Sequence, residues 1–368
     1  MKHNWEIKKL EDIADINYGT RIVQKVSGGF IYPVYGGGGA TFKSDDYNRE
    51  DCLIVSRFAM SKQCTRRVVG KFFLNDSGLT IVPKNNSILQ SFLDVQIIGL
   101  NDKIYSLGKG AAQRNLDIKE LKKLKISFPK SIETQQTIVK ELDLLSTLIN
   151  KQKAQLTELD RLAQSVFYDM FGDPVENEKG WEVKKLGELS EKIGDGLHGT
   201  PEYSENSEYY FINGNNLIEG DIIISALTQC VSKSEYEKHY IKFNDKTLFV
   251  SINGTIGKVA YYKDEKVILG KSACYIILQN DCILKTFLYA LLRSDYFREY
   301  ASKEKTGSTI SNVSLKSMRN MPIILPPLTL QQQFAATIEK IEAQKALVKQ
   351  SIAQSEQLLA SRMQYYFE

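Results

Sequence analysis

Two long stretches of the chain carry apolar residues at alternating spacings of four and three positions. The first stretch starts at Ile138 and ends at Met170, and the second starts at Phe334 and ends at Tyr366. This spacing is typical of the seam along which helices pair in a coiled coil. Because neither stretch contains Gly or Pro, the pattern predicts two long helices, over residues 131–172 and 328–368.

The seam positions of these two helices are predicted to form the helix and subunit interface. They are Ile138, Leu142, Leu145, Ile149, Leu156 and Leu159 in the first helix and Phe334, Ile338, Ile341, Val348, Ile352 and Leu359 in the second. Lys345, Ser355 and Arg362 weaken the second seam. If the seams pair, the short link between the first helix and the second domain makes the helices antiparallel, with the domains at opposite ends. The alternative interpretation is that each helix packs on its own domain.

The rest of the chain shows short β-branched or aromatic runs separated by Gly, Asn, Asp and Ser. Strands are predicted at 52–56, 79–82, 222–224, 248–252, 259–262 and 273–278, and a helix at 283–301. Regular alternation of strands with helices is missing. The pattern therefore predicts an α+β protein with two strand-rich domains, rather than a doubly wound parallel sheet.

An internal repeat divides the chain into two similar halves. Trp5-Glu6-Ile7-Lys8-Lys9-Leu10 recurs as Trp181-Glu182-Val183-Lys184-Lys185-Leu186, and the chain contains only these two tryptophans. A second matching segment places Asn115 over Asn312, where the offset has grown from 176 to 197 residues. We therefore predict a pseudo-two-fold tandem repeat. Its parts are a first domain over 1–130, a helix over 131–172, a second domain over 173–327 and a helix over 328–368.

Composition limits the chemistry that the chain could perform. The 48 Lys and Arg against 44 Asp and Glu leave a formal net charge of +4, which permits an anionic partner such as nucleic acid. Three histidines and five cysteines show no metal-binding spacing, so no metal site is predicted. The cysteines are expected to be buried, inert thiols without disulfides. No long apolar run and no signal-like N-terminus occur, which predicts a cytoplasmic protein away from membranes.

Two sequence motifs suggest catalysis or cofactor binding, and both lack the required context. Residues 194–199 match G-x-G-x-x-G, but a dinucleotide-binding loop opens a helix and this one runs into Thr200-Pro201. Gly270-Lys271-Ser272 resembles the end of a P-loop but lacks its first glycine, so a turn between strands is expected. We predict no catalytic residues. A dinucleotide-dependent oxidoreductase is one alternative, and a coiled-coil adaptor that binds only protein is another.

Four loops and a basic run suit the recognition of a polar surface. The loops are residues 18–21, 35–39, 197–201 and 251–258, and the basic run is 62–71. Such loops can contact phosphates through backbone N–H and hydroxyl groups and can bring Asn, His or Arg to base edges. Each cluster taken alone fits a solvated face or a hairpin turn better than it fits DNA binding. Their occurrence at similar places in both halves favours DNA binding.

Taken together, these features resemble a known family, the specificity (S) subunits of type I restriction-modification systems. The resemblance rests on the W-E-[IV]-K-K-L opening of each half, H-G-T-P at 198–201 and S-I-N-G-T-I-G at 251–257. It also rests on the Asn115 and Asn312 segments and on a Pro shortly before a Gln-Gln pair at each long helix. The similarity extends from Trp5 to Phe367.

The resemblance implies two target recognition domains, each reading one half of a bipartite double-stranded DNA sequence. It further implies two antiparallel helices that set the spacing and dock methyltransferase subunits, of which we expect two. Restriction subunits that translocate DNA would join through the complex. The resemblance also implies that the methyltransferase subunits methylate adenine. The chain itself would need no cofactor, because the partner subunits use S-adenosylmethionine, ATP and Mg²⁺. Residues 110–115 depart from the Ser/Thr-rich pattern at 307–312, so the two domains are predicted to read different half-sites.

The candidate DNA-binding residues come from these loops, basic runs and repeated segments. In the first half they are Tyr18, Thr20, Arg21, Tyr35, Gly37, Gly38, Arg57, Lys62, Arg66, Arg67, Lys109, Gln113, Arg114 and Asn115. In the second half they are His198, Thr200, Asn253, Thr255, Lys258, Ser308, Thr309, Ser311 and Asn312.

Overall fold

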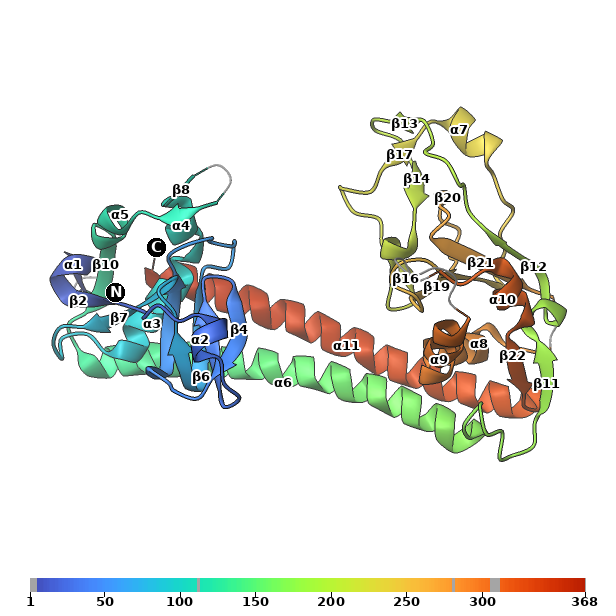
Figure 1. Cartoon of the computed structure of the whole chain (residues 1–368), viewed down its shortest axis with the longest axis horizontal. Coiled ribbons are helices and arrows are strands. Elements are labelled where there is room, and N and C mark those ends of the chain that lie inside the picture. The colour runs from blue at the N-terminus through green and yellow to red at the C-terminus, as the bar shows by residue number, and fades with distance from the viewer. Residues whose placement is uncertain (1–4, 111–112, 280–281, 305–311, 368) are drawn as a thin grey trace. The chain divides into compact units, whose positions relative to one another are not determined.

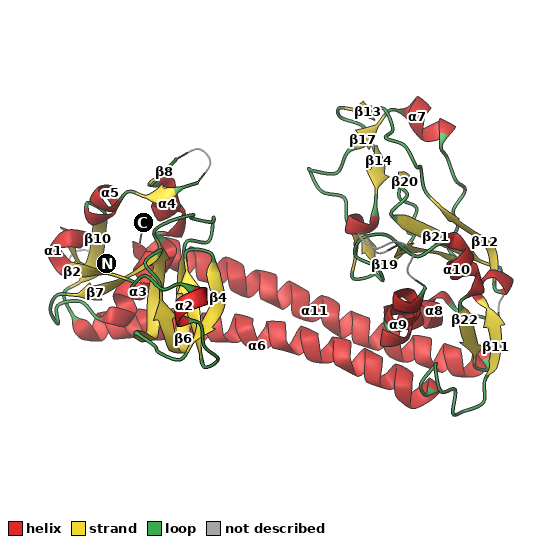
Figure 2. Ribbon diagram, in the orientation of Figure 1, coloured by secondary structure: helices red, strands yellow, loops and turns green. Residues whose placement is uncertain are grey.

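A computed structural model describes residues 5–110, 113–279, 282–304 and 312–367. The chain forms two compact units, the first from Met1–Lys153 and Gln350–Glu368 and the second from Ala154–Lys349. Each unit combines a strand-rich domain with parts of two 40-residue helices, α6 (Ile132–Phe171) and α11 (Leu328–Phe367) (Figure 1). The mixture of strands and helices in both domains confirms the predicted α+β class (Figure 2).

The first unit is built on a six-stranded sheet of order β2–β7–β5–β6–β3–β4. Its strands are β2 (Ala14–Tyr18), β3 (Tyr32–Gly36), β4 (Gly39–Ser44), β5 (Arg49–Ser56), β6 (Thr65–Leu74) and β7 (Gly78–Pro83). Two small ladders pair β1 (Trp5–Lys9) with β10 (Lys125–Pro129) and β8 (Gly108–Lys109) with β9 (Asn115–Leu116). The shorter helices are α1 (Leu10–Ile13), α2 (Gln24–Ser27), α3 (Gln90–Gly99), α4 (Asn101–Ser106) and α5 (Ile118–Lys122).

The second unit has two four-stranded sheets. The first contains β12 (Ser190–Asp195), β21 (Ala273–Leu278), β18 (Thr247–Ser251) and β19 (Val259–Tyr261), in that order. The second contains β13 (Tyr203–Ser204), β17 (Cys230–Val231), β14 (Tyr209–Ile212) and β20 (Val267–Leu269). Two ladders pair β11 (Glu182–Lys185) with β22 (Pro322–Leu325) and β15 (Leu217–Ile218) with β16 (Asp221–Ile222). The helical segments are η1 (Leu186–Glu188), η2 (Gly214–Asn216), α7 (Lys233–Lys238), α8 (Lys285–Arg293), α9 (Asp295–Lys303) and α10 (Leu315–Asn320).

Two local predictions were wrong. The helix expected over 283–301 is divided into α8 and α9, because Ser294 adopts an extended conformation with ψ 168°. Its hydroxyl donates a hydrogen bond to the Leu291 carbonyl at 2.7 Å, which competes with helix continuation. The strand expected over 222–224 ends at Ile222.

The internal repeat is visible in the strand order of the two units. The strands β2–β7–β5–β6 of the first unit correspond to β12–β21–β18–β19 of the second, and β1–β10 corresponds to β11–β22. The parallel pair β3–β6 has its counterpart in β14–β20. The additional residues of the second half lie mainly in the segment that carries β13 to β17 and α7.

A buried glutamine joins the start of each long helix to its own domain. In the first unit the Gln135 amide accepts from Leu89 N–H at 2.8 Å and donates to the Pro129 carbonyl at 2.8 Å. In the second, Gln331 accepts from Leu284 N–H at 2.9 Å and donates to the Pro326 carbonyl at 2.9 Å. Both side chains are fully buried, so losing either would leave buried polar groups unpaired. These bonds give the repeated Pro and Gln-Gln signal a physical reason.

Polar contacts show that the two helices pair in antiparallel orientation. Within the first unit Glu141 pairs with Arg362 at 2.7 Å, while Gln152 donates to Ser351 at 2.7 Å. The residue number therefore falls along α11 as it rises along α6. Within the second unit Asp160 of α6 pairs with Lys345 of α11 at 2.8 Å.

The predicted seam residues are buried to different degrees. The buried ones are Ile138, Leu142, Ile149, Leu159, Phe334, Ile341 and Ile352. Leu145, Leu156, Ile338, Val348 and Leu359 are half-buried. Ile138 and Leu142 also belong to the core of the first domain, as Phe334 does in the second. The alternative interpretation, packing on the helix's own domain, therefore also applies to these parts of the helices.

Lys345 is a buried charge on the seam of α11. Its side chain is 4% exposed, and Nζ lies 2.8 Å from Asp160 and 2.9 Å from Glu342. Burial lowers the pKa of Lys345, but the hydrogen bonds to the two carboxylates outweigh burial and raise the pKa overall. A lysine with a raised pKa stabilises the fold fully below its unfolded-state pKa. That contribution is lost as pH rises through the folded-state pKa, so neutral pH preserves it.

We expect Asp160→Ala to lower the free energy of unfolding by about 1–2 kcal/mol, because Lys345 stays buried with one acceptor fewer. Lys345→Met removes the charge itself and should leave the free energy within about 1 kcal/mol of wild type, or raise it. Glu158→Ala is the matched control, since Glu158 pairs with Arg161 in solvent, and should cost at most about 0.5 kcal/mol. Urea unfolding of the full chain measures all three. Equal losses in D160A and E158A would contradict the burial argument.

All five cysteines are free thiols. Cys64 and Cys274 are buried, and burial raises the pKa of both thiols, that of Cys64 to about 11. Both are therefore protonated at neutral pH and unreactive as nucleophiles.

In the part of the chain that the structure describes, no helix is both long and apolar enough to cross a membrane.

Candidate functional site

The same three chain segments meet at one edge of each domain. In the first unit Leu116 N–H, in β9, donates to the Arg57 carbonyl just after β5, at 2.8 Å. In the second unit Val313 N–H donates to the Ile252 carbonyl just after β18, at 2.9 Å. These bonds make Arg57 and Ile252 equivalent positions, so Phe58 corresponds to Asn253. They also place Asn115 and Asn312 next to the ends of equivalent strands.

The third segment follows β2 in the first unit and β12 in the second. A glycine begins it in each case. A Cβ atom at Gly19 would lie 2.0 Å from the Asn75 carbonyl oxygen, and a Cβ atom at Gly196 would lie 1.8 Å from the Leu269 carbonyl oxygen. Only glycine fits such a close approach of two backbones. Counting from these glycines, Tyr18 corresponds to Asp195 and Arg21 to His198. The two domains thus hold different side chains on one backbone frame.

In the first unit this edge gathers aromatic and basic side chains. The Arg57 guanidinium carbon lies 4.6 Å from the ring centroid of Tyr18 and 4.5 Å from that of Phe58. Asn115 is close by, since its Oδ1 accepts from Ala59 N–H at 3.3 Å. Arg114 lies over the ring of Tyr105 at 4.7 Å. Such a surface suits a polyanion with exposed base edges.

The turn between β3 and β4 reaches the same edge. The Gly37 carbonyl accepts from the Ser56 hydroxyl at 2.6 Å, and Gly37 N–H donates to the Ser77 hydroxyl at 3.0 Å. Arg66 contacts the same carbonyl at 3.4 Å. Gly38 has open space beside it, so another molecule could approach its backbone closely.

Other candidate residues of the first unit are engaged elsewhere. Tyr35 packs edge-on against Phe72 in a buried cluster, with ring centroids 5.4 Å apart. Arg67 lies 3.8 Å from Asp143 of α6. Lys109 forms an ion pair of 2.6 Å with Asp117, which raises the pKa of Lys109 and lowers that of Asp117. Thr20, Arg21, Lys62 and Gln113 are exposed.

In the second unit the equivalent edge forms a small polar pocket of about 270 Å³. Its lining includes Asp195, His198, Asn253, Lys271 and Asn312. His198 Nε2 lies 2.6 Å from Asp195 Oδ2, which orients the imidazole, and the backbones of Asn253 and Asn312 form an antiparallel bridge. Amide, imidazole and ammonium groups are the side chains that contact base edges and phosphates.

The loop after β18 is shaped by its own hydrogen bonds. The Ser251 hydroxyl donates to the Thr255 carbonyl at 2.6 Å and accepts from Lys258 N–H at 2.9 Å. Gly254 and Gly257 adopt φ angles of +74° and +88°, which favour glycine. These bonds hold Asn253 at the pocket, while Thr255 and Thr200 are exposed.

Three candidate residues, Ser308, Thr309 and Ser311, lie outside the described residues. Sequence reasoning missed three others: Phe58, Asp195 and Lys271. The repeat could have indicated Asp195, which aligns with Tyr18 once the glycines are matched. Phe58 follows no motif, and the P-loop-like segment Gly270-Lys271-Ser272 predicted only a turn, so the fold alone reveals that both residues lie at these edges.

The structure carries no support for the oxidoreductase alternative. After β12 the chain passes through residues 196–202 to β13 without opening a helix, so the helix N-terminus that would hold a pyrophosphate is absent there. Among the described residues, no group of three or more His, Cys, Asp or Glu could hold a metal ion.

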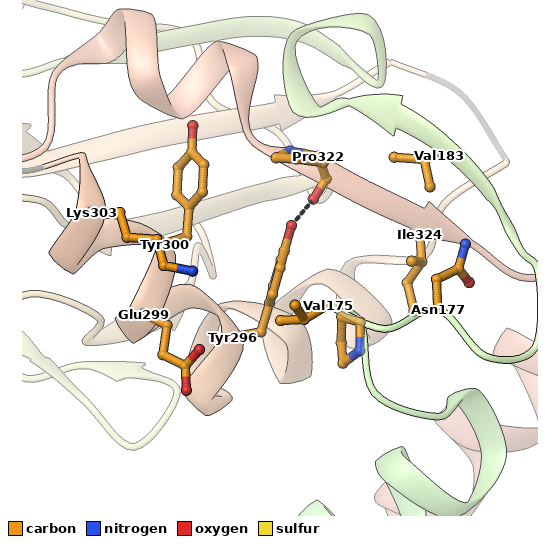
Figure 3. A pocket seen from close by; sticks show the side chains of 10 residues that line it. Val175, Asn177, Val183, Tyr296, Glu299, Tyr300, Lys303, Pro322 and Ile324 are labelled. Atoms are coloured by element: carbon orange, nitrogen blue, oxygen red, sulfur yellow. Dashed lines mark hydrogen bonds between the residues drawn. The ribbon is translucent and has the colours of Figure 1, made fainter.

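A separate pocket of about 300 Å³ lies in the second unit beside β11, β22 and α9 (Figure 3). Val175, Val183 and Ile324 give it an apolar side, while Tyr296 donates its hydroxyl to the Pro322 carbonyl at 2.5 Å. None of the candidate DNA-binding residues lines this pocket.

A family model described as the type I restriction modification DNA specificity domain matches residues 2–159 and 178–357. The chain is 22% identical to the type I restriction enzyme MjaIX specificity subunit of Methanocaldococcus jannaschii, with 92% of this chain and 87% of that protein covered. It is 24% identical to a putative type I specificity subunit, S.MpnORF507P, of Mycoplasma pneumoniae, with 81% and 77% covered.

Two solved structures share the fold. The crystal structure of the type I restriction-modification system S subunit from M. genitalium has a TM-score of 0.58 at 16% identity, covering 99% of this chain and 96% of that one. A chain from a structural study of complex assembly in the type I system has a TM-score of 0.55 at 14% identity, covering 98% and 97%.

Proposed function

The chain belongs to the family of type I restriction-modification DNA specificity proteins, and from this premise we propose that each of its units reads one half of a bipartite DNA target. The observation that carries the proposal is that each domain has the same edge, built from equivalent chain segments. Equivalent strand ends present Tyr18, Arg57 and Phe58 in one unit, and Asp195, Ile252 and Asn253 in the other. Because the side chains differ, the two half-sites differ and the full target is asymmetric.

We further propose that α6 and α11 set the distance between the half-sites and dock the methyltransferase subunits. Each helix contributes to both units, and the buried Gln135 and Gln331 tie both helix starts to their domains. The repeat offers the same docking features twice, which supports two methyltransferase subunits per chain. Restriction subunits would join the complex through these partners.

In this proposal the chain selects the sequence and its partners perform the chemistry. S-adenosylmethionine, ATP and Mg²⁺ would be used by the methyltransferase and restriction subunits, in the cytoplasm, where the DNA is. A net charge of +4 is small for a protein that binds DNA without partners, so the partner subunits would supply part of the salt-dependent affinity for DNA.

The test is to express the chain with its methyltransferase subunits in cells without adenine methylation and to map the methylated adenines. We expect one asymmetric motif of two specified halves separated by an unspecified spacer of constant length. The motif should vanish when this chain is omitted. Methylation that ignores the presence of this chain would refute the proposal and favour the coiled-coil adaptor.

A further inference from the structure

We propose that Arg57 reads a guanine in the half-site of the first unit, through the major groove. The inference rests on the proposed function and adds the identity of one base. Arg57 follows the end of β5 and lies at the edge where the loop after β2 and strand β9 converge.

The backbone at Arg57 is fixed on two sides. Its N–H donates to the Ser77 carbonyl at 2.7 Å, and its carbonyl accepts from Leu116 N–H at 2.8 Å. The next residue, Phe58, also donates its N–H to Ser77, at 3.3 Å. The Arg57 backbone, from which the side chain projects, is therefore held in place before DNA binds, which reduces the entropy lost on binding.

Two aromatic rings then hold the guanidinium itself. Its central carbon lies 4.6 Å from the Tyr18 centroid and 4.5 Å from the Phe58 centroid, within the range of cation–π attraction. The N–H donors of a guanidinium lie in its plane, and neither ring offers them an oxygen or nitrogen acceptor in these cation–π contacts, so the donors remain available to a ligand. Two such N–H donors side by side form a planar fork, which matches the O6 and N7 acceptors of guanine.

The donors of Arg57 are not used within the described part of the chain. Neighbouring arginines differ, since Arg49 donates to the Asn48 carbonyl at 2.7 Å and Arg66 to that of Gln63 at 3.0 Å. No carboxylate lies within 4.0 Å of Arg57 among the described residues. Its charge is therefore available to a ligand.

The surroundings favour a base over a phosphate as that ligand. Tyr18 and Phe58 are 45% and 36% exposed, so the fork emerges beside apolar rings that suit the base edges of a groove. A phosphate can also accept a bidentate arginine, but it gains nothing from apolar rings beside the guanidinium and carries no sequence information. The equivalent position in the second unit is Ile252, so we expect this guanine to be specified in one half-site only.

The test uses the full chain assembled with its methyltransferase subunits, on duplexes carrying the mapped target. Replacing the guanine by 7-deazaguanine removes N7 and keeps O6, so one of the two hydrogen bonds is lost and binding should weaken by about 5- to 10-fold, the lower end of the range for a bidentate pair. Replacing it by hypoxanthine removes only the minor-groove amino group and should change binding less than about twofold.

The Arg57→Lys variant keeps the charge and loses the fork. In this variant the penalty for 7-deazaguanine should shrink, because an ammonium group lacks the rigid planar donors of arginine, and methylation in cells should tolerate other bases at that position while the second half-site stays specified. Arg161→Lys is the control, because Arg161 is an exposed arginine of α6 paired with Glu158, and it should retain the full penalty.

Three outcomes would overturn the inference. One is a first half-site without guanine, and another is a wild-type complex indifferent to 7-deazaguanine. The third is an R57K variant that weakens binding equally on all sequences, as a phosphate contact would. In each case a bipartite target that depends on this chain would leave the proposed function standing, whereas methylation without such a target would defeat the function itself.

Discussion

Exchanging residues 1–130 for the corresponding domain of another specificity subunit is expected to change one half of the methylated sequence completely and to leave the other half unchanged. The physical reason is that the edge residues of the first unit, Tyr18, Arg57 and Asn115, all lie within the exchanged segment. The equivalent edge of the second unit lies entirely outside it. Mapping methylated adenines in cells that express the chimera measures the result.

The junction must respect the contacts that cross it. Trp5 and Phe92 pack with Phe367 of α11 in the core of the first unit, so the donor domain needs apolar side chains there. The reciprocal exchange of residues 173–327 is the control and should change only the other half-site. If either exchange altered both halves, the two units would not read DNA independently.

Placing a charge in the helix seam should have the second large effect. Ile149 and Ile341 are 6% and 5% exposed, so Ile149→Lys or Ile341→Lys would bury an unpaired ammonium and remove apolar packing. We expect each to lower the free energy of unfolding by about 3–5 kcal/mol. Charged substitutions at Leu145 and Leu156 should cost less, because these side chains are half-buried.

The matched controls lie on the same helices. Leu144 and Leu347 are 69% and 66% exposed, so L144K and L347K should unfold like the wild type in urea. The seam variants should also disturb assembly with methyltransferase subunits or change the spacer in the methylated motif. Seam variants as stable as their controls, with the same spacer, would show that the pairing of α6 and α11 does not set the distance.

The long helices and the internal repeat of this protein could be predicted from sequence, because each pattern extends over many residues. The two 40-residue helices follow from a mainly apolar spacing of four and three residues, a signal that accumulates over ten seam positions and survives polar residues such as Lys345 and Ser355. The repeat follows from Trp5 and Trp181 together with Asn115 and Asn312, because duplicated residues need no structural knowledge to align. Both signals average over many residues, so a local irregularity does not erase them.

Features that depend on tertiary contacts could not be predicted. Tyr18 and Arg57 are 39 residues apart, and only the pairing of β2 and β5 with the intervening β7 brings them together. Lys271 lines the second-unit pocket from the turn between β20 and β21. The sequence predicts that turn but not its place at the pocket. Ser294 divides a helix because its hydroxyl finds a local acceptor, a competition that helix propensity does not resolve.

The division of the chain into units has a consequence for biosynthesis. The second unit is one continuous segment, Ala154–Lys349, whereas the first needs Gln350–Glu368 as well. In that late segment Met363 and Phe367 pack against the core of the first domain. During translation the second unit can therefore complete its core first, while the first waits for nineteen more residues, which inverts the usual N-terminal-first order. Until then, the apolar surface around Phe92 is exposed to chaperones and proteases.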